Sequence, residues 1–429
     1  MIKQALQEIL DSLPKRILLD LLSRKVKEVG LNMPREVIDA FAEHILTKQE
    51  GSFVWHDSPD SENRNIKLEF TKEDIQEIDL KVEKTIKAIP EAILEASDRT
   101  SYQIFKRLRE KWDMEYAAQQ YVQESFRYGM EERWGRGLDY LRMLLTSCRD
   151  IGQQTMKRHS KSKSKQNMYR RWVMIRLHTR ACQVSDEIIC LMENGFADGA
   201  MARWRTLHEI SIVAALIADG DEDLAERYIL HDAVEVKRQA DDYDETQVPL
   251  GFSPIGKRHR RGIEQQYEAA LNRFGTTFAH PYGWAAKHLN LKKPTFKDLQ
   301  EAADRAGMSS HYKMASFNVH ASARSLFFNL ASIGDQTIFP AGRSNAGLVD
   351  PGERTAHTLA LITSLYVGHT LNIDRIIELK ALLRIRDAVG PALWGANKRL
   401  ERDEQARNIK LAERRERRAN KLNSTIRAN

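Results

Sequence analysis

The chain has 429 residues, of which 42% are hydrophobic and 30% are charged, and its formal net charge is +7. This length exceeds one typical hydrophobic core and predicts two or three structural units, while the composition excludes a disordered or fibrous protein. No apolar run approaches the roughly 18 residues of a membrane-spanning helix, and the opening MIKQALQEILDSLPKR lacks a signal-peptide core, so we expect a cytoplasmic protein without membrane contact.

The first 155 residues are predicted to form a helical recognition or oligomerisation module, because they carry no catalytic signature. Short amphipathic helices are expected over residues 2–46. The segments SFVWHD and NIKLEF, separated by SPDSENR, predict a small β-hairpin near residues 52–70. Thr71 and Asp74 have the spacing of a capping box for a helix through Ile86. Pro90 is expected to start or kink the next segment, with two or three long helices over residues 91–158.

A basic linker, residues 156–171, is the predicted domain boundary, followed by a helical domain over residues 172–390. We expect helices ending at Gly195 and Gly220, one capped by Asp221, another opened by Ser309 or Ser310, and a long one over residues 353–389. Residues 391–429 form a polar helical tail suited to a protein partner. The predicted class is an all-α multi-helix bundle. The chain has three cysteines, Cys148, Cys182 and Cys190, and no CxxC motif. We therefore expect buried thiols rather than disulfides or a structural zinc site.

Three of these helices carry polar side chains at four-residue spacing among apolar residues, which places each set on one helix face. An unpaired buried polar group costs roughly 1–3 kcal/mol, so we expect the three faces to meet in one enclosure. The sets are Arg205 and Glu209 with His208 beside them, Arg227, His231 and Glu235, and Tyr312, Ser316 and His320.

Three interpretations of this cluster remain open. A purely structural network would fix helix register. A catalytic site would use His231 or His320 as general acid and base, Arg205 or Arg227 to stabilise negative charge, Glu209 to orient an arginine, and Ser316 or Tyr312 to position substrate. Such a site suits cleavage of a phosphodiester and requires no metal or other cofactor. A metal site would use His231 and Glu235, with Asp232, Glu209 or His320, but the chain lacks HExxH.

The run GFADGAMARWRTLHEISIVAALIADGDEDLAERYILHDAVE, with YKMASFNVHASA further on, resembles a bacterial family catalogued as domain of unknown function 5677, over about residues 172–383. That resemblance implies a helical domain and no agreed activity. A looser similarity is to the HEPN superfamily of helical nucleases, whose ribonucleases carry an Arg and a His separated by four to six residues. Arg203 with His208, and Arg305 with His311, have this spacing. The polar residue usual after the Arg is replaced by Trp204 and Ala306.

Basic segments are the predicted contacts for RNA or DNA phosphates, although each also suits a solvated surface. The tail from residue 398 holds eleven Lys or Arg and five Asp or Glu, which accounts for most of the net charge. We therefore expect a metal-independent ribonuclease of HEPN-like type in bacterial defence or toxicity, or else a non-catalytic helical interaction protein, and a homo-oligomer in either case. The predicted phosphate-binding residues are Lys161, Lys163, Lys165, Arg258, Arg260, Arg414, Arg415, Arg417 and Arg418.

Overall fold

The computed structural model of the protein consists of α-helices and short 3-10 helices joined by loops, with no strand among the residues that it describes. The predicted all-α class is confirmed. No helix in the described part of the chain is long and apolar enough to cross a bilayer. The structure describes residues 2–48, 52–55, 68–161, 166–304, 306–317, 319–320, 322–331, 341–368 and 372–428.

The chain divides into two compact units, Met1–Ala118 and Gln119–Asn429. The division lies earlier than residue 155, because α3 (Lys72–Lys161) is one continuous helix whose last part buries Trp134, Leu138 and Leu144 in the core of the second unit. Pro90 lies inside α3 instead of interrupting it. Proline removes one backbone donor, and the exposed position of Pro90 lets water bind the carbonyl that loses its partner.

The first unit pairs α1 (Ile2–Glu28) with α2 (Arg35–Lys48) around Leu22, Ile38 and Ala42. The predicted capping box opens α3: the Thr71 N–H donates to Asp74 Oδ2 over 2.8 Å, and the Asp74 N–H donates to Thr71 Oγ1 over 3.3 Å. Hydrogen bonds from Lys25 and Thr71 lower the pKa of Asp74 to about 2. The carboxylate of Asp74 therefore ties the end of α1 to the start of α3.

The predicted β-hairpin is not confirmed. Its described residues, 52–55 and 68–70, form no strand, and residues 56–67 lie outside the described part of the chain. The apolar residues on which the strands were predicted pack against helices of the first unit instead. Phe53 stacks on Phe41 of α2 with ring centroids 4.9 Å apart, and Leu68 packs against the small core of the first unit.

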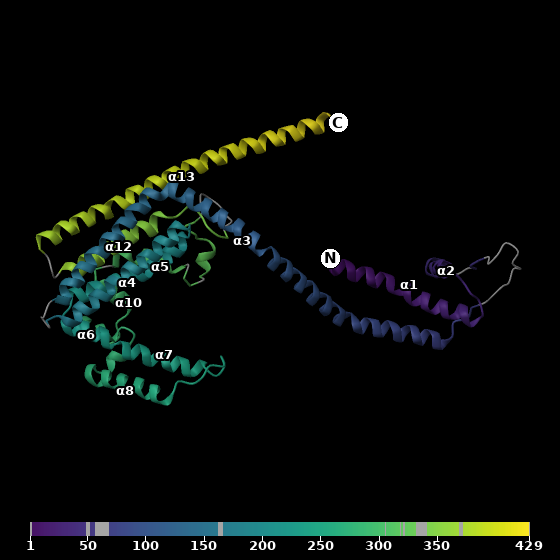
Figure 1. Cartoon of the computed structure of the whole chain (residues 1–429), viewed down its shortest axis with the longest axis horizontal. Coiled ribbons are helices and arrows are strands. Elements are labelled where there is room, and N and C mark those ends of the chain that lie inside the picture. The colour runs from purple at the N-terminus through teal and green to yellow at the C-terminus, as the bar shows by residue number, and fades with distance from the viewer. Residues whose placement is uncertain are drawn as a thin grey trace. The chain divides into compact units, whose positions relative to one another are not determined.

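The core of the second unit is built by α4 (Met168–Glu193), α5 (Ala197–Asp219) and α12 (Val349–Val367), with the last part of α3 and the first part of α13 (Ile373–Ala428) (Figure 1). The predicted stops are confirmed, since Gly195 follows α4 with φ 75° and Gly220 caps α5. Trp204 of α5 is fully buried, and its Nε1–H donates to Thr358 Oγ1 on α12 over 3.1 Å.

The segment after α5 is more broken than predicted. Asp221 caps α6 (Glu222–Leu230) by accepting the Leu224 N–H over 2.8 Å, as expected. The predicted helix that Asp221 caps then turns at His231 into α7 (Asp232–Thr246), which packs on α8 (Lys257–Phe274) (Figure 1). Short elements follow, namely η1 (Thr276–Ala279), η2 (Gly283–Ala285), α9 (Ala286–Leu289), α10 (Phe296–Ala302), η3 (Ala306–Met308), α11 (Ser309–Phe317) and η4 (Ala323–Leu326).

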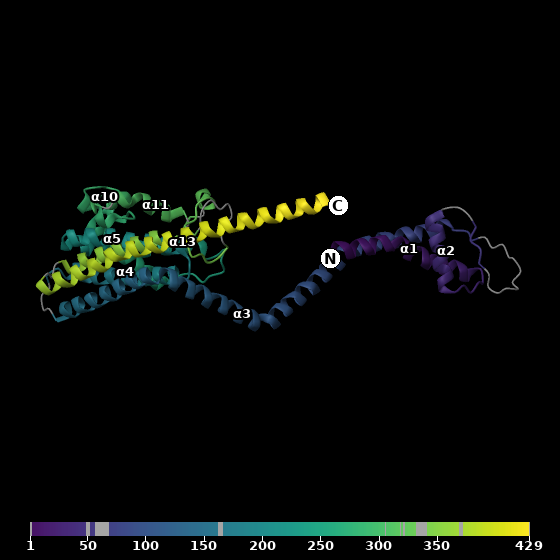
Figure 2. The ribbon, with the colours of Figure 1, turned by 90° about the horizontal axis from the view of Figure 1, so that it is seen from above.

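The predicted helix over residues 353–389 is divided, because α12 ends at Val367 and α13 begins at Ile373. Helix α13 instead continues through Pro391 into the predicted tail. Its first part buries Leu382, Val389, Leu393 and Leu400, whereas residues 405–417 are exposed, and Figures 1 and 2 both show α13 extending past the bundle. Cys148 and Cys182 are buried as expected, but Cys190 is exposed.

Candidate functional site

Helix α5 presents the polar residues of the ARWRTLHE segment to two different environments. Arg205 and Glu209 lie one turn apart on a partly exposed face, and Arg205 Nε donates to Glu209 Oε1 over 3.1 Å. Trp204 and His208 lie on the buried face, with 0% and 2% of their surface exposed. The sequence therefore combines a core face and a solvent-accessible ion pair within two turns.

The polar face of α11 meets Arg205 and Glu209. Tyr312 Oη donates to Glu209 Oε1 over 2.7 Å, and the Arg205 guanidinium lies over the Tyr312 ring, 4.7 Å from its centroid. Arg205 Nη1 lies 2.9 Å from His320 Nε2. We refer to Arg205, Glu209, Tyr312 and His320 as the α5–α11 cluster. Two of the three predicted polar faces are thus in contact.

His320 occupies a turn after α11 rather than the helix itself. Its N–H donates to Ser316 O over 3.1 Å, and Ser316 Oγ donates to Tyr312 O over 2.8 Å. The Ser316 hydroxyl is therefore bonded to the backbone one turn before it, and the Ser316 carbonyl accepts from the backbone of His320. The His320 side chain is exposed and reachable from solvent.

The protonation states in this cluster follow from its contacts. Burial and the hydrogen bond to Glu209 raise the pKa of Tyr312 to about 12, so the phenol keeps its proton at neutral pH. Burial lowers the pKa of Arg205, but the contacts with Tyr312 and Glu209 outweigh burial and raise it overall. Because a guanidinium only donates hydrogen bonds, His320 Nε2 accepts from Arg205, and the ring proton then lies on Nδ1. The cluster thus offers a fixed cation, a proton acceptor and a proton donor.

His208 has a packing environment rather than a solvent-facing one. Its ring lies between those of Trp204 and Tyr312, at centroid distances of 5.2 and 5.7 Å, and its Nε2 is 3.1 Å from Gln300 Nε2. His208 therefore positions Tyr312 from the core side. The sequence placed His208 beside Arg205 and Glu209, and the structure buries its side chain on the neighbouring face of α5.

Arg227 and His231 contact residues of the α6–α8 region and the loop after it. Arg227 Nε donates to Asp223 Oδ2 over 2.7 Å, and its guanidinium lies 4.5 Å from the centroid of the Phe274 ring. His231 is 2% exposed, and its Nε2 donates to His280 O over 2.9 Å, because a carbonyl oxygen only accepts. The turn at His231 redirects the chain, so these two residues support the α6–α8 region instead of joining the α5–α11 cluster.

Tyr282, just before η2, was missed by the sequence analysis. Burial raises its pKa, the carboxylates of Glu209 and Glu235 add to the rise, and the charge of Arg205 opposes it. Its ring lies 6.3 Å from that of Phe296, which in turn lies 4.9 Å from Tyr312. Tyr282 therefore stands between the cluster and the predicted third polar face. No helical spacing marks it, since it belongs to a loop.

One family of proteins matches part of the chain. Residues 171–336 match DUF5677, a family of unknown function. The DUF5677 segment ends earlier than the expected residue 383 but contains the whole α5–α11 cluster, while α12 and α13 lie beyond it. No curated protein and no solved structure matches the chain.

Of the two HEPN-like spacings, the described residues cover Arg203 with His208, and these two side chains have different surroundings. Arg203 forms an ion pair with Glu187 of α4, whereas His208 is buried. Arg305 lies outside the described residues. His311 Nε2 accepts from Arg354 Nη2 on α12 over 2.5 Å, and burial together with this charge lowers the pKa of His311. No match to HEPN nucleases supports the predicted similarity.

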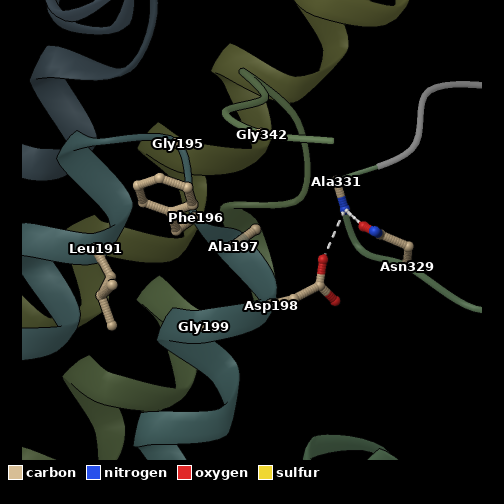
Figure 3. Close-up of a pocket in the computed structure, with 9 residues that line it drawn as sticks. All are labelled: Leu191, Gly195, Phe196, Ala197, Asp198, Gly199, Asn329, Ala331 and Gly342. Carbon is tan, nitrogen blue, oxygen red and sulfur yellow. Dashed lines mark hydrogen bonds between the residues drawn. The ribbon is translucent and has the colours of Figure 1, made fainter. Parts of the chain in front are cut away.

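The candidate metal ligands and a separate pocket both lie outside the α5–α11 cluster or involve residues beyond it. Among the described residues, no group of three His, Cys, Asp or Glu side chains could hold a metal ion, and the candidate pair His231 Nδ1 and Glu235 Oε1 is 3.7 Å apart. A pocket of about 370 Å³ lies beside the start of α5, where the Asp198 carboxylate accepts the Ala331 N–H over 3.4 Å. Figure 3 shows the residues that line it. Its lining contains no residue of the α5–α11 cluster.

The predicted phosphate-binding residues differ in their surroundings. Lys161 ends α3, and Lys163 and Lys165 lie outside the described residues. Arg258 is exposed on α8, whereas Arg260 forms ion pairs with Asp241 and Asp244. The remaining four residues lie on α13. Arg414, Arg415 and Arg417 are exposed, and the side chain of Arg418 is outside the described part of the chain.

Proposed function

We propose that the protein is a metal-independent endoribonuclease whose active site is the α5–α11 cluster. The observation that supports this proposal is the position of Arg205 between the Glu209 carboxylate and the exposed His320 imidazole, 3.1 and 2.9 Å away. An arginine fixed by a carboxylate, beside a histidine nitrogen that accepts its hydrogen bond and a protonated tyrosine, provides the groups that phosphodiester cleavage needs.

In the proposed reaction, a phosphate oxygen accepts hydrogen bonds from Arg205, which frees His320 Nε2. His320 then takes the proton of the 2′-hydroxyl as the 2′-oxygen forms a bond to phosphorus. The P–O5′ bond breaks, and O5′ receives a proton from Tyr312 Oη, leaving a 2′,3′-cyclic phosphate and a free 5′-hydroxyl. Proton transfer from His320 through water restores Tyr312. No step requires a metal ion.

Arg205→Gln is expected to lower RNA cleavage by about 100-fold, because it removes the cation that stabilises charge on the phosphate. The measurement is cleavage of a labelled RNA by the purified full chain in excess EDTA. Arg180→Gln, at an exposed arginine of α4, is the matched control and should cleave like the unsubstituted protein. Expression of the unsubstituted protein, but not of Arg205→Gln, should arrest bacterial growth if cleavage serves a toxin or defence role. Absence of cleavage by the unsubstituted protein in EDTA would refute the proposal.

We infer a second, separate role for the exposed part of α13 in binding nucleic-acid phosphates. Arg414, Arg415 and Arg417 are exposed there, and release of counterions from phosphates makes such binding salt-dependent. Replacing all three by Gln is expected to reduce the slope of log affinity against log salt by about 2 to 3 units. Fluorescence anisotropy with a labelled RNA measures this slope. An unchanged slope would show that the arginines contact no phosphate.

A further inference from the structure

Helix α3 carries an apolar stripe that nothing in the described first unit covers. Ile104, Leu108, Trp112 and Tyr116 recur every fourth residue, Phe105 lies beside them, and all five are between 52% and 64% exposed. The stripe is about 18 Å long at the rise of an α-helix. We refer to these five residues as the α3 stripe.

An exposed stripe of this kind needs a partner. Helices in proteins gain most of their stability from burying one face, and large contiguous apolar patches mark interaction surfaces. Since a buried aromatic side chain covers roughly 150–250 Å², the α3 stripe offers on the order of 500 Å². Tyr102, 66% exposed, lies one turn before Phe105 and extends it. The total approaches the roughly 800 Å² that each partner contributes to a standard protein interface.

The charges beside the stripe indicate which partner fits. Lys111 and Glu115 lie along one of its edges, one helical turn apart. If two copies of α3 cross antiparallel about Asp113, Lys111 of each copy faces Glu115 of the other, and Leu108 faces Ala118. A parallel pair in register would instead place Lys111 against Lys111. The Lys106–Glu110 ion pair at 3.9 Å and the acidic Asp113 make the region mixed in charge, which disfavours an anionic membrane.

We propose that the α3 stripe binds a second copy of this chain in an antiparallel pair centred on Asp113. The proposal is independent of the ribonuclease activity, since it uses no residue of the α5–α11 cluster. Trp112 lies nearest the centre of the interface and is expected to contribute most to affinity, as central aromatic residues commonly do.

Sedimentation of the full chain across micromolar concentrations tests the proposal. The unsubstituted chain should dimerise, and Trp112→Ala should weaken the dimer about tenfold or more. Lys111→Glu and Glu115→Lys should each weaken it, and the double exchange should restore it. Lys87→Glu is the matched control, because Lys87 is an exposed α3 lysine 2.6 Å from Glu83 but outside the stripe. A chain that stays monomeric, or a dimer indifferent to these changes, would overturn the proposal.

Disulfide formation tests the orientation in a Cys190→Ser background, which removes the exposed thiol. An equimolar mixture of Lys111→Cys and Glu115→Cys chains should cross-link, because these two positions face each other across the antiparallel pair. Ile104→Cys alone should not, since the antiparallel arrangement separates the two copies of that residue by roughly 27 Å along the helix. Equal cross-linking of Ile104→Cys and of the mixture would contradict the antiparallel pair. If the chain instead stays monomeric and binds phosphatidylserine vesicles through the α3 stripe, the stripe is a membrane-binding surface and the proposed pair is wrong.

Discussion

Replacing His320 by alanine is expected to slow RNA cleavage by at least about 100-fold, the usual contribution of a positioned general acid or base. The imidazole accepts a hydrogen bond from Arg205 at 2.9 Å and is the exposed proton acceptor of the α5–α11 cluster. His320 is the one imidazole among the four residues of the cluster. The measurement is the single-turnover rate with a labelled RNA in EDTA.

The same change should hardly alter stability, because truncating an exposed side chain creates no cavity. We expect a change below about 0.5 kcal/mol in the free energy of unfolding. His259→Ala, at an exposed histidine of α8, controls for the loss of an imidazole and should leave both the rate and the stability unchanged. If His320→Ala cleaves at the unsubstituted rate, His320 is not the base. If it unfolds, the cluster is a structural network, as the alternative interpretation of the sequence holds.

The largest effect on stability is expected from Trp204→Ala, which should lower the free energy of unfolding by about 3–5 kcal/mol. Trp204 is 0% exposed, its Nε1–H donates to Thr358 on α12, and its ring stacks on His208 at 5.2 Å. The substitution leaves a cavity at the junction of α5 and α12. Urea unfolding followed by circular dichroism measures the loss.

Trp394→Ala provides the comparison, since Trp394 on α13 is 49% exposed and should cost less than about 1 kcal/mol. Similar losses for the two tryptophans would mean that Trp204 is not part of a tightly packed core. Trp204→Ala should reduce cleavage in proportion to the fraction of unfolded protein, because Trp204 is not a member of the α5–α11 cluster.

Local signals in the sequence predicted the parts of the fold that short-range chemistry decides. The capping oxygens of Thr71 and Asp221 and the stops at Gly195 and Gly220 depend on neighbouring residues, and the structure agrees with each of them. The spacing of Arg205 and Glu209 likewise placed them on one face. These features need no knowledge of distant parts of the chain.

Tertiary contacts decided what the sequence could not predict. The His231 side chain bonds to the His280 carbonyl, 49 residues away, and so lies outside the cluster. His320 reaches Arg205 from a turn after α11, although spacing alone placed it on a helix. The burial of His208 depends on Gln300 and Trp204, and Tyr282 comes from a loop without a repeating pattern.

The central claim, that the α5–α11 cluster cleaves RNA through the 2′-hydroxyl, is tested most directly by the substrate itself. The full chain is incubated in EDTA with an RNA and with the same RNA carrying a 2′-O-methyl group at the cleaved position, and the product ends are identified by mass spectrometry. We predict a 2′,3′-cyclic phosphate from the unmodified RNA and no cleavage at the methylated position. Cleavage of the methylated RNA at an equal rate, or products ending in 3′-hydroxyl and 5′-phosphate, would contradict the proposed mechanism.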